Sequence, residues 1–187
     1  MKKQLLIGLA LTLLSSSVYA HPGHSGSGFF AGFSHPFTGL DHLLVMLAIG
    51  LWAGKIGGSA RWQLPLTFVL IMACSATFGL TGIPALETGV AASVMAMGLL
   101  LTISLPINRT VQLGLTAIFA MLHGFAHGAE LSLEDGSQML LGMALATALL
   151  HSAGLMLASQ HIKLHPSLQT TLGWLTFLAG GYMLLAL

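Results

Sequence analysis

Six long apolar blocks, joined by short polar connections, make up most of this sequence. They cover roughly residues 40–53, 64–80, 89–105, 111–127, 138–158 and 168–187. All but the first approach the ~17–25 residues that a helix needs to cross a bilayer. Only 6% of the 187 residues are charged, whereas a soluble domain carries about a quarter. Most of the folded surface must therefore face lipid, and we expect an all-α membrane protein with six transmembrane helices.

The N-terminal residues have the pattern of a cleaved signal peptide. Lys2 and Lys3 provide the positive end, residues 5–14 the apolar stretch, and Val18-Tyr19-Ala20 the cleavage site. The apolar stretch is short for an uncleaved membrane anchor. The expected organisation is a signal peptide over residues 1–20, a His/Gly/Ser-rich periplasmic arm over residues 21–28, and a six-helix transmembrane domain over residues 29–187.

The first apolar block is too short to cross a bilayer unless residues 29–37 are added to it. The extended block contains Pro36 and Gly39, two residues that interrupt helices. We therefore expect the first helix to be broken or re-entrant near Pro36–Gly39. Thr38 and Asp41 are three residues apart, the pattern of a capping box that would restart the helix.

Charged residues in the connections predict the orientation in the membrane. Basic residues follow the first, third and fifth blocks, and acidic residues follow the second and fourth. The basic residues are Lys55, Arg61, Arg109 and Lys163, and the acidic ones are Glu87, Glu130, Glu134 and Asp135. Because basic connections stay in the cytoplasm, we expect a bacterial inner-membrane protein with its mature N-terminus and its C-terminus in the periplasm.

The remaining composition excludes several classes of protein. Loss of Lys2 and Lys3 from the six Lys and Arg residues leaves four against five Asp and Glu, a net charge of −1. That balance lacks the excess of basic residues that is typical of nucleic-acid-binding proteins. Cys74 is the single cysteine and forms no intrachain disulfide. The sequence has no Walker A glycine-lysine loop, so the chain itself hydrolyses no nucleotide.

The first of two motifs rich in ionisable residues is His35-Pro-Phe-Thr-Gly-Leu-Asp41-His42. If the helix restarts near Thr38, Asp41 and His42 lie in its first turn. His35 precedes the break and can fold back toward them. A carboxylate, imidazoles and the exposed carbonyls of a broken helix suit a borderline divalent cation.

The second motif is His123-Gly-Phe-Ala-His127-Gly-Ala-Glu130. Its spacing of i, i+4 and i+7 places all three ionisable side chains on one helix face. The expected topology brings both motifs to the outer ends of their helices. Ionisable groups inside a membrane cost about 2.5–3.5 kcal/mol each, so their convergence predicts a metal site.

Three other histidines are weaker candidates. His151 is expected ~20 Å below the outer surface at 1.5 Å per residue. It is either a ligand below the main site or an interhelical hydrogen-bonding group. His21 and His24 would lie on the flexible N-terminal arm, where they either capture metal or belong to a polar tail near the membrane.

The two motifs resemble the HPxxGxDH and HGxAHGxE signatures of the HupE/UreJ family, and the likeness extends from the signal peptide through all six blocks. It implies a permease for Ni²⁺, or for Co²⁺ in some members. The ion is then a transported substrate, with no prosthetic group. Genes for this family often stand beside those for hydrogenase or urease, so maturation proteins of these enzymes are possible partners. The ligands implied by motif match are His35, Asp41, His42, His123, His127 and Glu130.

Two other functions fit the same residues. An intramembrane zinc hydrolase would hold an activated water at three ligands, with Glu130 or Asp41 as its general base. A haem protein would use two of the histidines as axial ligands. Ligand type alone also leaves Co²⁺, Zn²⁺ and Cu²⁺ open beside Ni²⁺. The oligomeric state, and whether the motifs form one site or two, stay open at this point.

Overall fold

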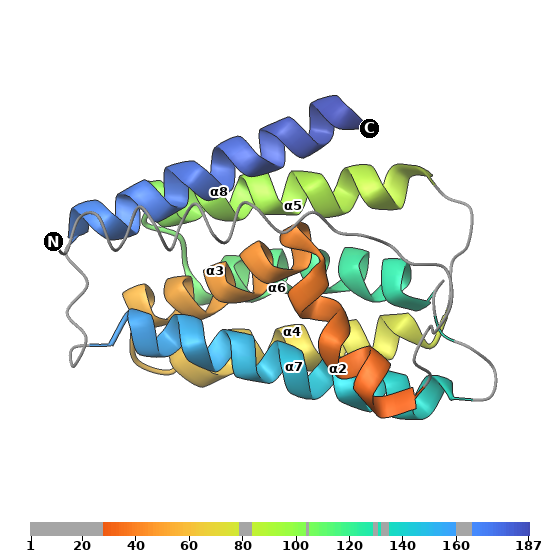
Figure 1. Ribbon diagram of the computed structural model, residues 1–187. Helices are drawn as coiled ribbons and strands as arrows, with labels where there is room; N and C mark the ends of the chain where they lie inside the picture. Colours follow the sequence, from red (N-terminus) through yellow and green to blue (C-terminus); the bar gives the residue numbers. More distant parts are fainter. Residues whose placement is uncertain (1–27, 79–83, 104, 129–130, 132–134, 160–165) are drawn as a thin grey trace, which may run out of the picture.

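Seven helices form the computed structural model, which describes residues 28–78, 84–103, 105–128, 131, 135–159 and 166–187 (Figure 1). The helices are α2 (Gly28–Thr38), α3 (Leu40–Ile56), α4 (Ala60–Ala76), α5 (Pro84–Thr102), α6 (Arg109–Gly128), α7 (Gly136–Leu157) and α8 (Pro166–Ala186). No strand occurs in these ranges, so the expected all-α class is confirmed. The predicted signal peptide and the N-terminal arm lie outside the described residues.

Not every helix has the length and hydropathy of a typical membrane span. Helices α5 and α7 have both, over Ala85–Thr102 and Gly136–Leu157, and α2 with α3 qualify together as one bent pair. Helix α4 is apolar but has 17 residues. Helices α6 and α8 have 20 and 21 residues but fall short in hydropathy. The described part of the chain thus contains two or three typical spans, and six crossings stay a prediction.

The break in the first helix is present, and Gly39 causes it. Helices α2 and α3 meet there at a bend of 81°, and Gly39 is extended, with φ −90° and ψ 120°. Pro36 lies inside α2 and does not end it. The predicted capping box is wrong: Thr38 Oγ1 donates to the carbonyl of His35 instead. The carboxylate of Asp41 accepts from the backbone N–H of His42, so it is directed toward that residue.

Glycines allow the helices to pack closely in pairs. A Cβ atom added at these positions would overlap backbone or side-chain atoms of the neighbouring helix. The pairs are Gly32 of α2 with Met139 of α7, Gly50 of α3 with His151 of α7, Gly98 of α5 with Phe177 of α8, and Gly124 of α6 with Ser75 of α4. Such close approach of small residues is typical of helices that pack in lipid.

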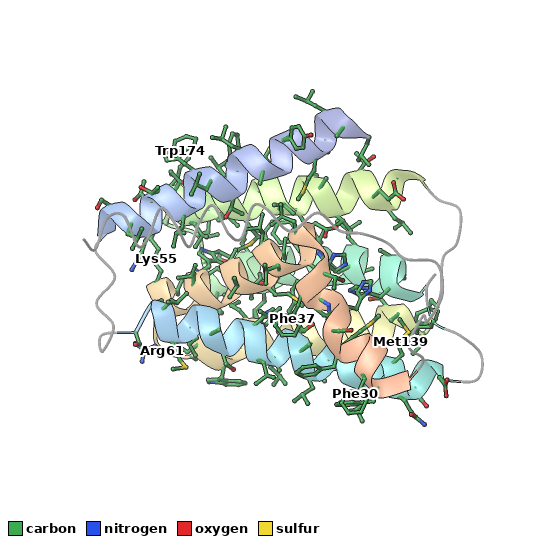
Figure 2. All side chains as sticks on the ribbon, viewed as in Figure 1. Phe30, Phe37, Lys55, Arg61, Met139 and Trp174 are labelled. Atoms are coloured by element: carbon green, nitrogen blue, oxygen red, sulfur yellow. The ribbon has the colours of Figure 1, made fainter. Side chains whose placement is uncertain are left out.

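Polar side chains occur near both ends of the buried face of α6, with Phe119 and Ala120 between them. Gln112, Thr116, His123 and His127 all lie on this face and are buried. Large apolar residues instead project from the outside of the bundle, as Figure 2 shows; examples are Leu141, Leu149 and Leu178. This arrangement, with polar groups inside and apolar groups outside, is what a bilayer requires of a helical protein.

Candidate metal site

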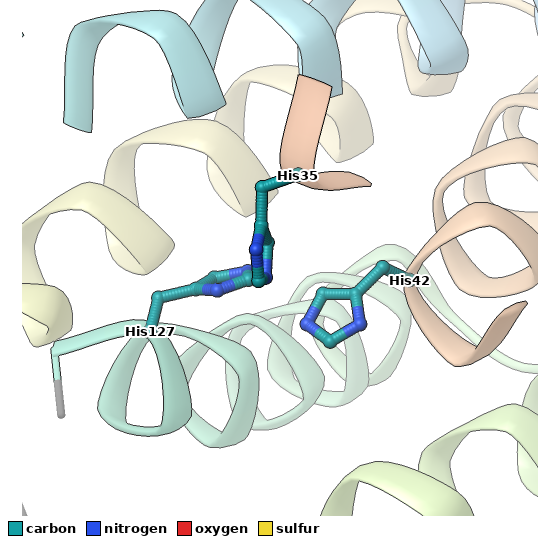
Figure 3. Close-up of side chains that lie close together, drawn as sticks. All are labelled: His35, His42 and His127. Atoms are coloured by element: carbon teal, nitrogen blue, oxygen red, sulfur yellow. The ribbon is translucent and has the colours of Figure 1, made fainter. Parts of the chain in front are cut away.

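Three imidazoles from three different helices converge near the bend between α2 and α3 (Figure 3). They belong to His35 of α2, His42 of α3 and His127 of α6. One ring nitrogen from each lies within 4.8 Å of the other two. Two nitrogens bound to one ion at ~2.1 Å each are at most about 4.2 Å apart. The three rings therefore need little movement to ligate a single transition-metal ion.

The bend at Gly39 is what brings His35 and His42 together. In a continuous helix these residues would share a face but lie ~10 Å apart along the axis. With the 81° bend, their ring centroids are 5.4 Å apart. The His127 ring lies 4.9 Å from that of His35 and 4.5 Å from that of His42. Sequence motifs placed far apart along the chain thus contribute to one group.

Asp41 orients His42. Its Oδ1 atom accepts a hydrogen bond from Nδ1 of His42 at 2.7 Å. A carboxylate only accepts, so the neutral imidazole carries its proton on Nδ1 and its lone pair on Nε2. Nε2 is buried and has no hydrogen-bond partner among the described residues. The pair has the carboxylate–histidine geometry found around protein-bound metals, and Asp41 lies behind His42 rather than among the three converging groups.

His123 lies one helical turn deeper on α6 and is fully buried. Its Nδ1 donates to the carbonyl oxygen of Phe119 at 2.8 Å, which again leaves the lone pair on Nε2. Its ring centroid lies 5.2 Å from that of His42. His123 therefore touches the three-histidine group from below, without having a ring nitrogen among the three that converge.

The other predicted site residues are placed differently. Glu130, His21 and His24 lie outside the described residues. His151 of α7 is buried, and the ring of Phe68 contacts both His151 and His123, with centroid distances of 5.0 Å and 5.6 Å. Sequence reasoning missed Phe68, because one aromatic residue within an apolar block gives no signal that separates it from ordinary packing.

The helices and the buried imidazoles define the class: this is an all-helical membrane protein with a group of histidines inside its helix bundle. More narrowly, the chain belongs to the HupE/UreJ family, whose pattern it matches over residues 9–183. It is 40% identical over 154 residues to Protein HupE from Rhizobium leguminosarum bv. viciae, an alignment that covers 81% of each chain. The family resemblance predicted from the two motifs is thereby confirmed. No solved structure matches the chain.

Proposed function

We propose that this protein is a permease that carries a divalent transition-metal ion, Ni²⁺ first and Co²⁺ second, into the bacterial cytoplasm. The single observation that carries the proposal is the convergence of His35, His42 and His127 within 4.8 Å inside an apolar bundle. Ionisable side chains are rare within membranes and mark ion pathways where they occur. Asp41, His123 and Glu130 complete the proposed site, with Asp41 supplying the negative charge.

The donor set favours a borderline ion over a soft one. Imidazole suits nickel, copper and zinc, whereas thiolate selects copper(I) and zinc. The one cysteine, Cys74, is exposed on α4 and lies outside the histidine group. Membership in the HupE/UreJ family adds weight to Ni²⁺ and Co²⁺ over Zn²⁺ and Cu²⁺, because the motif resemblance implies those two ions.

The orientation proposed for the bundle opens this site to the periplasm. Lys55 and Arg61 lie at one end of the bundle, whereas Phe30 and Met139 lie at the other, beside α2 (Figure 2). The positive-inside rule assigns the basic end to the cytoplasm. An inward dication then gains about 4.6 kcal/mol per 100 mV, twice the ~2.3 kcal/mol of a single charge. Six crossings in the inner membrane, with both mature termini outside, complete the proposal.

The two alternative functions are less well supported. A zinc hydrolase could use the same three imidazoles, but of its two candidate general bases Asp41 is hydrogen-bonded to His42 and Glu130 lies outside the described residues. A haem needs two imidazoles on opposite faces of a flat macrocycle. The rings of His35, His42 and His127 instead contact one another, with centroids 4.5–5.4 Å apart. Neither alternative explains why polar residues occur near both ends of the buried face of α6.

Uptake of ⁶³Ni²⁺ into proteoliposomes tests the permease directly. The purified protein should give uptake that rises with an inside-negative potential, and His127→Ala should abolish it. Cys74→Ala is the matched control, because this exposed side chain lies outside the site, and it should transport like the wild type. Tight metal binding without uptake under any gradient would overturn the permease and favour the hydrolase.

A further inference from the structure

A further buried histidine, His151, lies deeper in the bundle, below Phe68. His151 of α7 is 1% exposed, and its Nδ1 donates to the carbonyl oxygen of Met46 in α3 at 3.0 Å. Since a carbonyl only accepts, the neutral ring carries its proton on Nδ1. The lone pair is then on Nε2, which is buried and has no hydrogen-bond partner within the described ranges. A buried polar atom left unpaired lowers stability unless a ligand pairs with it.

Two thioether sulfurs lie one helical turn from His151, toward the outer end. Thr147 Oγ1 is 3.3 Å from Sδ of Met46 and 3.8 Å from Sδ of Met72. All three side chains are fully buried. Helices α3, α4 and α7 thus bring one imidazole, one hydroxyl and two sulfurs into the same region of the bundle.

The hydroxyl of Thr147 is directed unusually for a helical threonine. Such a side chain ordinarily donates to the carbonyl one turn back, as Thr116 and Thr176 do here. Thr147 faces the sulfurs of Met46 and Met72 instead. This contact holds both thioethers at one place, although methionine side chains are otherwise flexible.

Phe68 lies next to both this region and the three-histidine group. Its fully buried ring contacts both His123 and His151, with centroid distances of 5.6 Å and 5.0 Å. Both histidines hold their Nδ1 proton on a backbone carbonyl. Two imidazoles with matching protonation, and with available Nε2 atoms, therefore contact one aromatic ring.

We propose that His151, with the thioether sulfurs of Met46 and Met72, forms a second, inner binding site for the transported divalent ion. The proposal rests on the proposed function, since it places this site after the histidine group on the inward path. Imidazole suits a borderline ion, whereas thioether is a soft ligand that prefers copper(I) and holds such an ion only weakly. The inner group contains no carboxylate, so it binds a dication more weakly than the outer group with Asp41. Weak binding at successive sites is what allows an ion to leave.

Two variants separate a ligand role for His151 from a structural one. His151→Asn places an amide N–H where Nδ1 lies, so the hydrogen bond to Met46 can persist while the Nε2 ligand is lost. Met46→Leu combined with Met72→Leu conserves the side-chain volume, a change that cores tolerate well, and removes both sulfurs. Thr171→Ser is the matched control, since this exposed helical residue donates to its own helix.

Equilibrium binding of ⁶³Ni²⁺ to the purified full chain and uptake into proteoliposomes should be measured together. The wild type should bind two ions, one tightly and one weakly. Both variants should lose the weak ion, keep the tight one, and slow uptake by at least the ~10–100-fold typical of damaged metal sites. X-ray absorption of the two-ion form should include sulfur scattering that the methionine variant lacks.

Unchanged stoichiometry and uptake in His151→Asn would overturn the inner site, and so would a single bound ion in the wild type. If His151→Asn fails to fold, the double methionine variant still tests the inner site. Failure of the proposed function is a distinct result: the wild type would bind two ions and His151→Asn one, while neither moved nickel across the membrane. The inner site would then stand without transport.

Discussion

Oδ1 of Asp41 lies 2.7 Å from Nδ1 of His42, its neighbour in the first turn of α3. The same oxygen accepts the backbone N–H of His42 at 2.8 Å. These two hydrogen bonds hold the Nδ1 side of the ring against the carboxylate, and Nε2 has no hydrogen-bond partner among the described residues. The charge of Asp41 therefore acts on the proposed site through His42, which makes this pair the most sensitive point of the first motif.

Asp41→Asn should keep the fold and weaken nickel binding. The amide oxygen can still accept from both N–H groups of His42, but as a neutral acceptor it holds the Nδ1 proton more weakly and no longer raises the basicity of Nε2. Loss of such a partner typically lowers affinity or activity by about 10–100-fold. The measurement is ⁶³Ni²⁺ binding and uptake by the purified protein. Asp135→Asn, which removes a carboxylate at the start of α7, should leave both near wild type. Equal losses in both variants would contradict a specific role for Asp41.

Much of this arrangement follows from residue spacing. His123 and His127 are four positions apart, so a helix must place them on one face, and both are buried there. Pro36 and Gly39 together predicted a break in the first helix. The alternation of basic and acidic connections predicted that the two motifs lie on the same side of the membrane, and His35, His42 and His127 do lie close together; the orientation itself stays a prediction.

Other features depend on packing that no spacing shows. Asp41 was expected to ligate; its carboxylate accepts from the ring of its neighbour His42, a contact that the spacing did not show, and a ligand role for Asp41 stays a prediction. Phe68 and Met72 are ordinary members of an apolar block until α4 meets α6 and α7. Thr147 turns toward sulfur only because Met46 of α3 lies against α7. The contacts of Thr147 and His151 with Met46 and Met72 join residues 75 to 105 positions apart, and a single sequence does not reveal such pairings.

Gly39→Ala should impair metal binding more than it impairs stability. The backbone at Gly39, with φ −90° and ψ 120°, suits alanine, so no backbone strain arises. The added Cβ, however, would lie 2.8 Å from Oδ1 of Asp41 and 2.9 Å from Nδ1 of His42. The pair must then separate, and ⁶³Ni²⁺ affinity should fall by about tenfold or more.

Gly114→Ala is the control for this glycine replacement. Nothing lies within 4 Å of a Cβ at Gly114, which is inside α6, where alanine is favoured by up to about 1 kcal/mol. This variant should melt at the same temperature as the wild type or slightly higher, with normal uptake. If Gly39→Ala also transported normally, the Asp41–His42 contact would not be needed.

His35→Ala and His127→Ala should each abolish nickel uptake, and the double variant should be no worse than either one. The reason is that ligands of one ion act as a unit, so their losses do not add. The assay is initial ⁶³Ni²⁺ uptake at matched protein levels, with thermal unfolding in detergent to check the fold. Residual uptake in each single variant that the double variant lowers further would instead indicate two separate sites, one at each motif. His35 and His127 would then not share an ion, despite the 4.9 Å between their ring centroids.

Cysteine labelling tests the proposed orientation, starting from Cys74→Ala so that the background is free of thiols. Ser59→Cys adds an exposed thiol beside Lys55 and Arg61, and Ser137→Cys adds one at the start of α7. The positive-inside rule places position 59 in the cytoplasm. A membrane-impermeant maleimide added to intact spheroplasts should therefore label position 137 and leave position 59 unlabelled until the membrane is opened. The reverse pattern would put the histidine group on the cytoplasmic side. An inside-negative potential would then oppose outward movement of a cation from that group. The protein would have to work as something other than an uptake permease.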